Sequence, residues 1–219
     1  MDYEIRHILL SNWLAPVYVG VLLLLTFART LYARRFSEWV QLAVTDKYFA
    51  MEGKVNAFFH PFNLLLFGVQ VLAFSMLIYQ YLAIESPDSS TGFLKYLQIV
   101  SGYTVFVTFK FYLEKLIAHV LDFEALLDRY LYEKLSYLNL MGMVLMVILP
   151  FLSFSLEVEK IFYLVLFGVL ALFYLLILFS TVKRNQELLF RHFFYFILYL
   201  CALELAPLVI LYQVFVFQG

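Results

Sequence analysis

One carboxylate stands in the middle of an otherwise apolar run near the end of the chain. The run covers residues 193–216 and contains Glu204 near its centre, with Arg191 and His192 just before it. About twenty apolar residues are enough for a helix to cross the ~30 Å hydrocarbon core of a membrane. An acidic group at the centre of such a helix costs about 2.5–3.5 kcal/mol of insertion free energy unless something compensates. Glu204 is therefore the first candidate for chemistry, as a carrier of a proton or ion or as an anchor for a partner helix.

The alternative for Glu204 is a structural carboxyl, which is neutral because it is desolvated or is paired inside the bundle. Lys110 is the candidate cation, because it lies about seven residues, or roughly 10 Å, inside the end of its own apolar run. Its long stem could equally bring the ammonium group to the membrane surface. The sequence favours a structural or assembly role for Glu204 over proton transport.

A second polar group opens another apolar run, in the sequence His60-Pro61-Phe62-Asn63, with Gln70 further along. Proline is common in the first turn of a helix. Asn63 and Gln70 are seven residues apart. A helix therefore presents both amides on one face, where they can bond to a neighbouring helix. We interpret these residues as contacts between helices, with a functional role as the alternative.

Three histidines, His60, His119 and His192, fall at the ends of apolar runs. Imidazole ligates metal ions and haem iron, so a metal or haem site is one hypothesis. However, no short spacing such as H-x-x-x-H or H-E-x-x-H occurs. The single cysteine, Cys201, excludes an internal disulfide and any multi-cysteine metal site. We expect no cofactor, and the three histidines remain an alternative.

The composition shows what must position these residues. Hydrophobic residues make up 64% of the 219-residue chain and charged residues 14%, whereas a soluble domain has about 25% charged residues. A core of this size cannot hide so much apolar surface, so lipid must solvate much of it. The net charge of −1 gives no basis for binding nucleic acid. The expected partners are the lipid bilayer and other integral membrane proteins.

We predict an all-α fold, a polytopic transmembrane helical bundle of about six spans that forms a single domain over residues 1–219. Two amphipathic segments, residues 34–43 and 122–135, are expected to be interfacial helices on the cytoplasmic side. In the second segment, Glu124, Asp128, Arg129 and Glu133 are placed on the wetter side. The spans are predicted near residues 10–32, 58–83, 94–117, 136–155, 160–181 and 193–216.

Basic residues predict the orientation. Of the 15 lysines and arginines, all except Arg6, Lys95 and Lys160 fall on one side of such a bundle. The positive-inside rule places that side in the cytoplasm and both termini on the outer side, which is the periplasm in the location inferred below. The N-terminal segment lacks the basic region and cleavage site of a signal peptide, so the first span is expected to be retained.

Four further stretches of sequence stand out: Lys47-Tyr48-Phe49, His60 to Asn63 with Phe67 and Gln70, residues 134–140, and residues 192–208. Together they resemble a family of small integral membrane proteins of unknown function from Bacteroidota, domain of unknown function 4271. The last stretch is the most specific, and the resemblance extends over nearly the whole chain. It implies a multi-pass protein of the inner membrane of a bacterium that also has an outer membrane. It implies no activity.

Several signals of catalysis and transport are missing from the sequence. No serine sits in G-x-S-x-G, no glycine-rich loop could hold phosphate, and no G-x-x-x-G is present. We therefore favour a non-catalytic inner-membrane accessory or scaffold subunit of a larger assembly, such as one for protein export or the cell envelope. The first alternative is a small proton-coupled transporter or channel that uses Glu204. The second is a haem- or metal-binding membrane protein that uses His60, His119 and His192.

Overall fold

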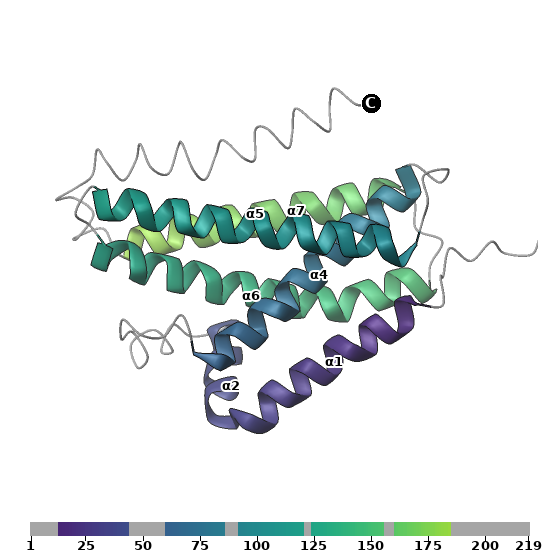
Figure 1. Cartoon of the computed structure of the whole chain (residues 1–219), viewed down its shortest axis with the longest axis horizontal. Helices are drawn as coiled ribbons and strands as arrows, with labels where there is room; N and C mark the ends of the chain where they lie inside the picture. The colour runs from purple at the N-terminus through teal and green to yellow at the C-terminus, as the bar shows by residue number, and fades with distance from the viewer. Residues whose placement is uncertain (1–12, 44–59, 86–91, 121–123, 156–159, 185–219) are drawn as a thin grey trace, which may run out of the picture.

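The computed structural model describes residues 13–43, 60–85, 92–120, 124–155 and 160–184, and this part of the chain is entirely helical (Figure 1). The all-α prediction is confirmed. The helices are α1 (Leu14–Leu31), α2 (Ala33–Val40) with the short 3₁₀ turn η1 (Gln41–Ala43), α4 (Pro61–Glu85), α5 (Phe93–Val120), α6 (Glu124–Ser155) and α7 (Lys160–Arg184).

Four of these helices, α1, α4, α6 and α7, are long and apolar enough to cross a membrane. The protein is therefore a membrane-embedded helical bundle. Helix α5 has 28 residues, a length of about 42 Å, but it is more polar because it carries Lys95, Lys110, Glu114 and Lys115. The last predicted run, residues 193–216, lies outside the described residues.

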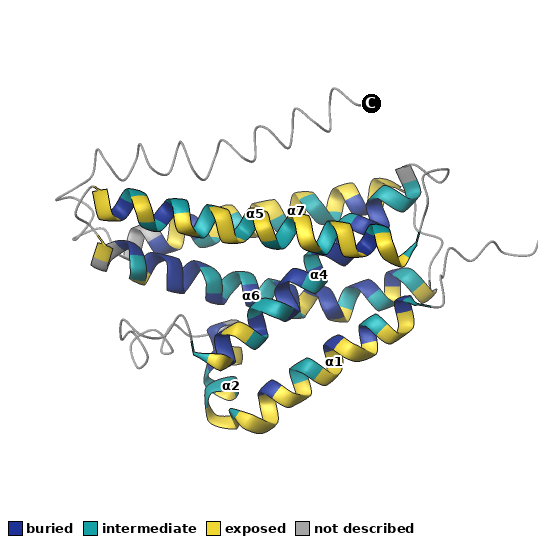
Figure 2. Cartoon of the chain, viewed as in Figure 1, coloured by how far each residue is buried: buried dark blue, intermediate teal, exposed yellow. Residues whose placement is uncertain are grey.

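Helix α4 is the centre of the bundle, because it packs against α1, α5, α6 and α7. Its buried residues include Phe62, Leu66, Met76 and Leu77, and it is apolar around its whole circumference. A helix of this kind is stable only when it is surrounded. In Figure 2, α4 shows much buried surface, whereas α1, α5 and α7 carry many exposed residues, mostly apolar ones that suit contact with lipid.

The backbones of α4 and α6 approach closely at one glycine. A Cβ atom built on Gly142 would lie 2.8 Å from the Cα atom of Gln70. Side chains do not tolerate such a contact with backbone, so the absence of a side chain at position 142 permits this crossing.

A hydrogen-bond network around Gln80 connects four helices. The Gln80 side-chain amide donates to the Tyr18 hydroxyl on α1 at 2.7 Å and to the Ser153 hydroxyl on α6 at 2.6 Å. The Tyr163 hydroxyl on α7 donates to the Gln80 carbonyl oxygen at 3.0 Å. Hydrogen bonds between membrane helices hold their relative positions without a hydrophobic driving force.

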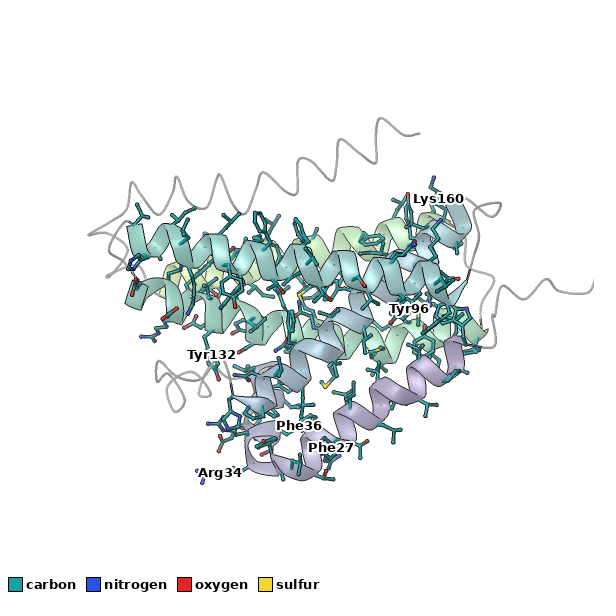
Figure 3. All side chains as sticks on the ribbon, in the orientation of Figure 1. Phe27, Arg34, Phe36, Tyr96, Tyr132 and Lys160 are labelled. Atoms are coloured by element: carbon teal, nitrogen blue, oxygen red, sulfur yellow. The ribbon has the colours of Figure 1, made fainter. Side chains whose placement is uncertain are left out.

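The two ends of the bundle differ in their side chains (Figure 3). One end has the Tyr96 and Trp13 rings in contact, with centroids 5.2 Å apart, and also Lys160. We call the other the basic end. It contains the end of α1, the beginning of α4, the end of α5 and the beginning of α6, with Arg29, Lys110, Lys115, Arg129 and Lys134.

Two sequence interpretations need correction. In the described part of the segment 122–135, residues 124–135 do not form a separate interfacial helix before a span, because Glu124–Ser155 is one continuous helix. Glu133 does not face the wetter side, because it is fully buried beside Arg129, with 3.5 Å between Nε and Oε1. The helical pattern of the sequence does not indicate the burial of Glu133, because tertiary packing covers the side of α6 that carries it.

The amphipathic segment 34–43 forms α2 and η1, which fold against the bundle. Trp39 is fully buried, and its indole N–H donates to the Ser136 carbonyl at 3.3 Å. The Trp39 ring also meets Phe62 of α4, with centroids 6.3 Å apart. The apolar face of this segment therefore covers protein from α4 and α6.

Candidate functional site

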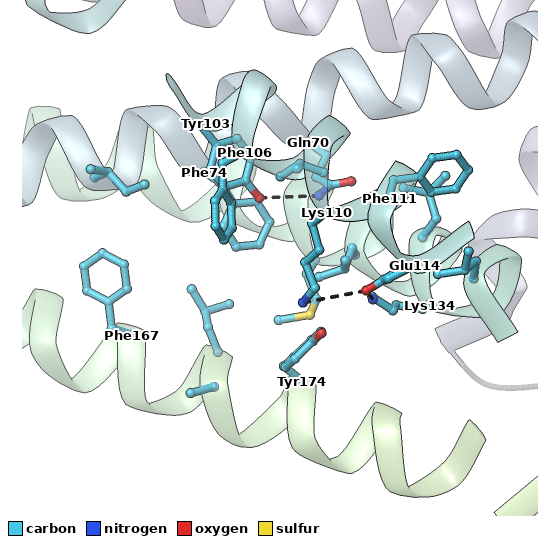
Figure 4. Close-up of a pocket in the computed structure, with 18 residues that line it drawn as sticks. Gln70, Phe74, Tyr103, Phe106, Lys110, Phe111, Glu114, Lys134, Phe167 and Tyr174 are labelled. Atoms are coloured by element: carbon cyan, nitrogen blue, oxygen red, sulfur yellow. Dashed lines mark hydrogen bonds and ion pairs between the residues drawn. The ribbon is translucent and has the colours of Figure 1, made fainter. Parts of the chain in front are cut away.

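A cavity of about 310 Å³ lies between α4, α5, α6 and α7 (Figure 4). Most of its wall is aromatic or aliphatic, with Phe74 from α4, Phe106 from α5, Leu138 from α6 and Phe167 from α7. Charged side chains are confined to the part of the wall nearest the basic end. Ligand sites often combine an apolar wall with a few polar groups in this way.

Three charged side chains meet at that part of the wall. The Lys134 ammonium group donates a 2.8 Å hydrogen bond to Oε1 of Glu114, and the Lys110 nitrogen lies 3.9 Å from the same oxygen. The side chain of Glu114 is 2% exposed, that of Lys134 9% and that of Lys110 19%. Glu114 is thus enclosed, whereas Lys110 is the most accessible member of the group.

The sequence positions two of these groups through helix geometry alone. Lys110 and Glu114 are four residues apart on α5, so they lie on the same face of the helix. Lys134 comes from α6, which returns antiparallel to α5 after a short connection. Its ammonium group also lies over the Tyr130 ring, 5.6 Å from the centroid.

Further ion pairs fasten the end of α5 to the beginning of α6. Lys115 lies 3.3 Å from Asp128, and His119 pairs with Glu124. These pairs are partly exposed, so each adds little to stability. Together with the buried Lys134–Glu114 pair they fix how the two helices meet at the basic end.

The other part of the cavity is mostly apolar, and its polar groups are the paired side chains of Gln70 and Tyr103. The Gln70 amide of α4 is 3.5 Å from the Tyr103 hydroxyl of α5, and the Tyr103 ring stacks on Phe74 with centroids 5.9 Å apart. Gln70 is fully buried. The hydrogen bond from Gln70 of α4 to Tyr103 of α5 is a contact between helices, which is the role that we interpret for Gln70 from the sequence.

The structure brings some of the residues singled out in the sequence together and separates others. Lys110 and Gln70 both line the cavity, on α5 and α4. Asn63 is buried in the first turn of α4 and does not line it. Glu204 lies outside the described residues, so its proposed contact with Lys110 remains a prediction.

Two of the three histidines have local roles. Nδ1 of His60 accepts a 3.2 Å hydrogen bond from the Phe62 N–H at the start of α4, and its ring meets Tyr32 edge-on. His119 pairs with Glu124, and His192 lies outside the described residues. Within the described ranges, no group of three His, Cys, Asp or Glu residues could hold a metal ion.

Glu114 and Lys134 are not among the candidate functional residues that the sequence indicates. The four-residue spacing from Lys110 could have identified Glu114 as its neighbour. Lys134 follows Glu133 in a segment with several other charges, so no local signal in the sequence distinguishes it. Their pairing could not be read from spacing, because it depends on how α5 and α6 are aligned.

A comparison with known protein families shows to which family this chain belongs. The model of a family described as Domain of unknown function (DUF4271) matches residues 14–215, which include every described helix. The chain belongs to the DUF4271 family. No curated protein and no solved structure matches it. The charged cavity between α4 and α7 is thus part of the DUF4271 domain itself.

Proposed function

We propose that this DUF4271 protein is a non-catalytic accessory or scaffold subunit of a larger assembly in the inner membrane of a Bacteroidota bacterium. The assembly would serve a process such as protein export or construction of the cell envelope. In this proposal the chain crosses the membrane six times, with the basic end in the cytoplasm and both termini in the periplasm.

The observation that carries the proposal is an apolar stripe along α5. Its members lie on one helical face and are 59–73% exposed: Val105, Phe109, Tyr112, Leu116 and Val120. A hydrocarbon core of ~30 Å takes about twenty residues of helix, so α5 leaves it near residue 112 when it enters at Phe93. Leu116 and Val120 then stand beyond the lipid tails. Exposed apolar side chains outside lipid are typical of a protein contact.

The packing of the bundle supports a fixed scaffold. The Gln80 network joins α1, α4, α6 and α7, and the Gly142 crossing brings α4 and α6 into backbone contact. Transporters that work by alternating access move groups of helices against one another. Interlocked helices instead present a constant surface to a partner.

Gentle extraction followed by mass measurement tests this proposal. We expect a defined complex heavier than the 25.8 kDa chain, and we expect Leu116→Glu to release the chain from it. Thr30→Glu, which adds the same charge at an exposed position on α1, serves as the matched control and should stay in the complex. A lone monomer under all mild conditions would contradict the proposal.

A small proton-coupled transporter or channel is the second candidate. The buried Glu114 and Lys134 side chains, with the half-buried Lys110 beside them, favour it, because ionisable groups inside a membrane protein often mark an ion or proton path. In this candidate Glu204 is the titrating group. Glu204→Gln should then abolish transport while the protein stays folded and abundant. If that variant disappears from the membrane, the carboxyl is structural.

A further inference from the structure

We infer that the cavity between α4, α5, α6 and α7 binds one acyl chain of an anionic phospholipid, with the lipid phosphate beside Lys110 and Lys134. This site is independent of the scaffold role proposed above, because it uses the interior of the bundle and not the outer stripe of α5.

The cavity has the dimensions of a single chain. Along α5 its lining runs from Tyr103 to Glu114, a distance of about 16 Å at 1.5 Å per residue. Its volume of about 310 Å³ is at the lower limit of the roughly 300–1,000 Å³ found for ligand sites. A space of this length and volume can accommodate one flexible chain.

The chemistry of the wall changes along this length, as Figure 4 shows. Phe74 and Phe106 lie near Tyr103, and Phe167 faces them from α7, so this part offers apolar contacts, with the Tyr103 phenol and the Gln70 amide as its polar groups. The ammonium groups of Lys110 and Lys134 lie at the other part, beside Glu114. An apolar tail and a charged head on one molecule match this division.

The charges favour an anionic head. The described lining residues contribute two ammonium groups and one carboxylate, and a phosphodiester carries a single negative charge. Lysine binds phosphate as a compact positive charge. Lys110 is the group that a phosphate can approach, because it is more exposed than Lys134 and stands further from Glu114.

The depth of the charged groups also fits a lipid head. Lys110 and Glu114 lie about 26 and 32 Å along α5 from Phe93, at 1.5 Å per residue. The hydrocarbon core is ~30 Å thick, so both residues are close to its boundary at the basic end. A phospholipid of that leaflet can place its phosphate there while one of its chains enters the cavity.

Native mass spectrometry of the delipidated full-length protein tests the site. Phosphatidylglycerol and phosphatidylcholine with the same acyl chains are titrated separately. We expect phosphatidylglycerol to bind more tightly, and Lys110→Met to weaken it about tenfold, because one charge-assisted contact is lost. Lys115→Met is the matched control. It removes the next lysine along α5, five residues away, which pairs with Asp128 and does not line the cavity, and should leave lipid binding unchanged.

A second variant keeps the test independent of the lysines. Ala171→Trp places a large ring at the cavity wall on α7 and should weaken both lipids without changing the charge. Equal binding of the two lipids by the wild type, or equal loss in Lys110→Met and Lys115→Met, would overturn the inference. A preference for oleate over phosphatidylglycerol would also overturn it. So would lipid binding that appears only in Glu204→Gln, because this result would show that the Glu204 carboxylate occupies the site in the wild type.

Discussion

Lys134 of α6 and Glu114 of α5 form a buried ion pair, with 2.8 Å between Nζ and Oε1. Each charge is removed from water and is satisfied by the other helix. Loss of Lys134 therefore leaves the buried Glu114 with only its longer contact to Lys110, 3.9 Å away, whereas loss of both Lys134 and Glu114 removes the buried pair as a unit. This asymmetry predicts how substitutions at the pair should combine.

We expect Lys134→Met to lower the free energy of unfolding by about 3–5 kcal/mol, and Glu114→Leu to be destabilising as well. The double variant should recover most of the loss. Unfolding in mixed detergent and sodium dodecyl sulfate micelles, followed by circular dichroism, measures all three. Strictly additive losses would show that the two side chains do not act as a pair.

The crossing of α4 and α6 predicts a contrast between two glycines. Gly142→Ala should destabilise the bundle by about 1–3 kcal/mol, because the new Cβ atom meets the Gln70 backbone at 2.8 Å. Gly168→Ala on α7 is the control, because a Cβ atom there has nothing within 4 Å. It should be neutral or stabilising by up to about 1 kcal/mol, since alanine favours helix. Similar unfolding curves for the two variants would contradict the close crossing.

The Gln80 network predicts graded losses. Gln80→Leu removes hydrogen bonds to Tyr18, Ser153 and Tyr163, and at about 0.6 kcal/mol for each bond the loss should be about 2 kcal/mol. Tyr163→Phe removes one of them and should cost about 0.6 kcal/mol. The same unfolding assay compares them. A larger loss for Tyr163→Phe than for Gln80→Leu would place the centre of the network elsewhere.

The proposed orientation predicts which residues meet each side of the membrane. In a variant without Cys201, His119→Cys should react with a membrane-impermeant thiol reagent only after the inner membrane has been permeabilised. Lys160→Cys, at the opposite end of the bundle, should react from outside. Both positions are exposed, so access to the reagent depends on the membrane alone. Labelling of His119→Cys in intact cells would reverse the orientation.

The sequence predicts the helices well where long apolar runs demand them. The run near residues 58–83 corresponds to α4, Pro61–Glu85, and the run near 160–181 lies within α7, Lys160–Arg184. Backbone groups in lipid must bond within their own helix, so such runs leave few other structures open. The boundary between residues 122–135 and 136–155 was not predictable, because charge changes along α6 while the helix continues.

The cavity combines residues that the sequence indicates with contacts that only the tertiary structure shows. Lys110 and Gln70 were recognised as unusual polar residues in apolar runs, and both line it. Glu133 was placed toward water because helical periodicity cannot show which neighbour covers a face. The Lys134–Glu114 contact depends on the alignment of α5 with α6, and no local pattern encodes that alignment.

The bonds of Gln80 have a consequence for the way the chain is made. Tyr18 is translated before Gln80, whereas Ser153 and Tyr163 follow 73 and 83 residues later. Until they emerge from the ribosome, Tyr18 is the one of these three partners that is present, and the Gln80 side-chain carbonyl must be satisfied by water or by the insertion machinery, since bare lipid offers it no partner. The central helix is thus the one whose release into the bilayer has to wait for the helices translated after it.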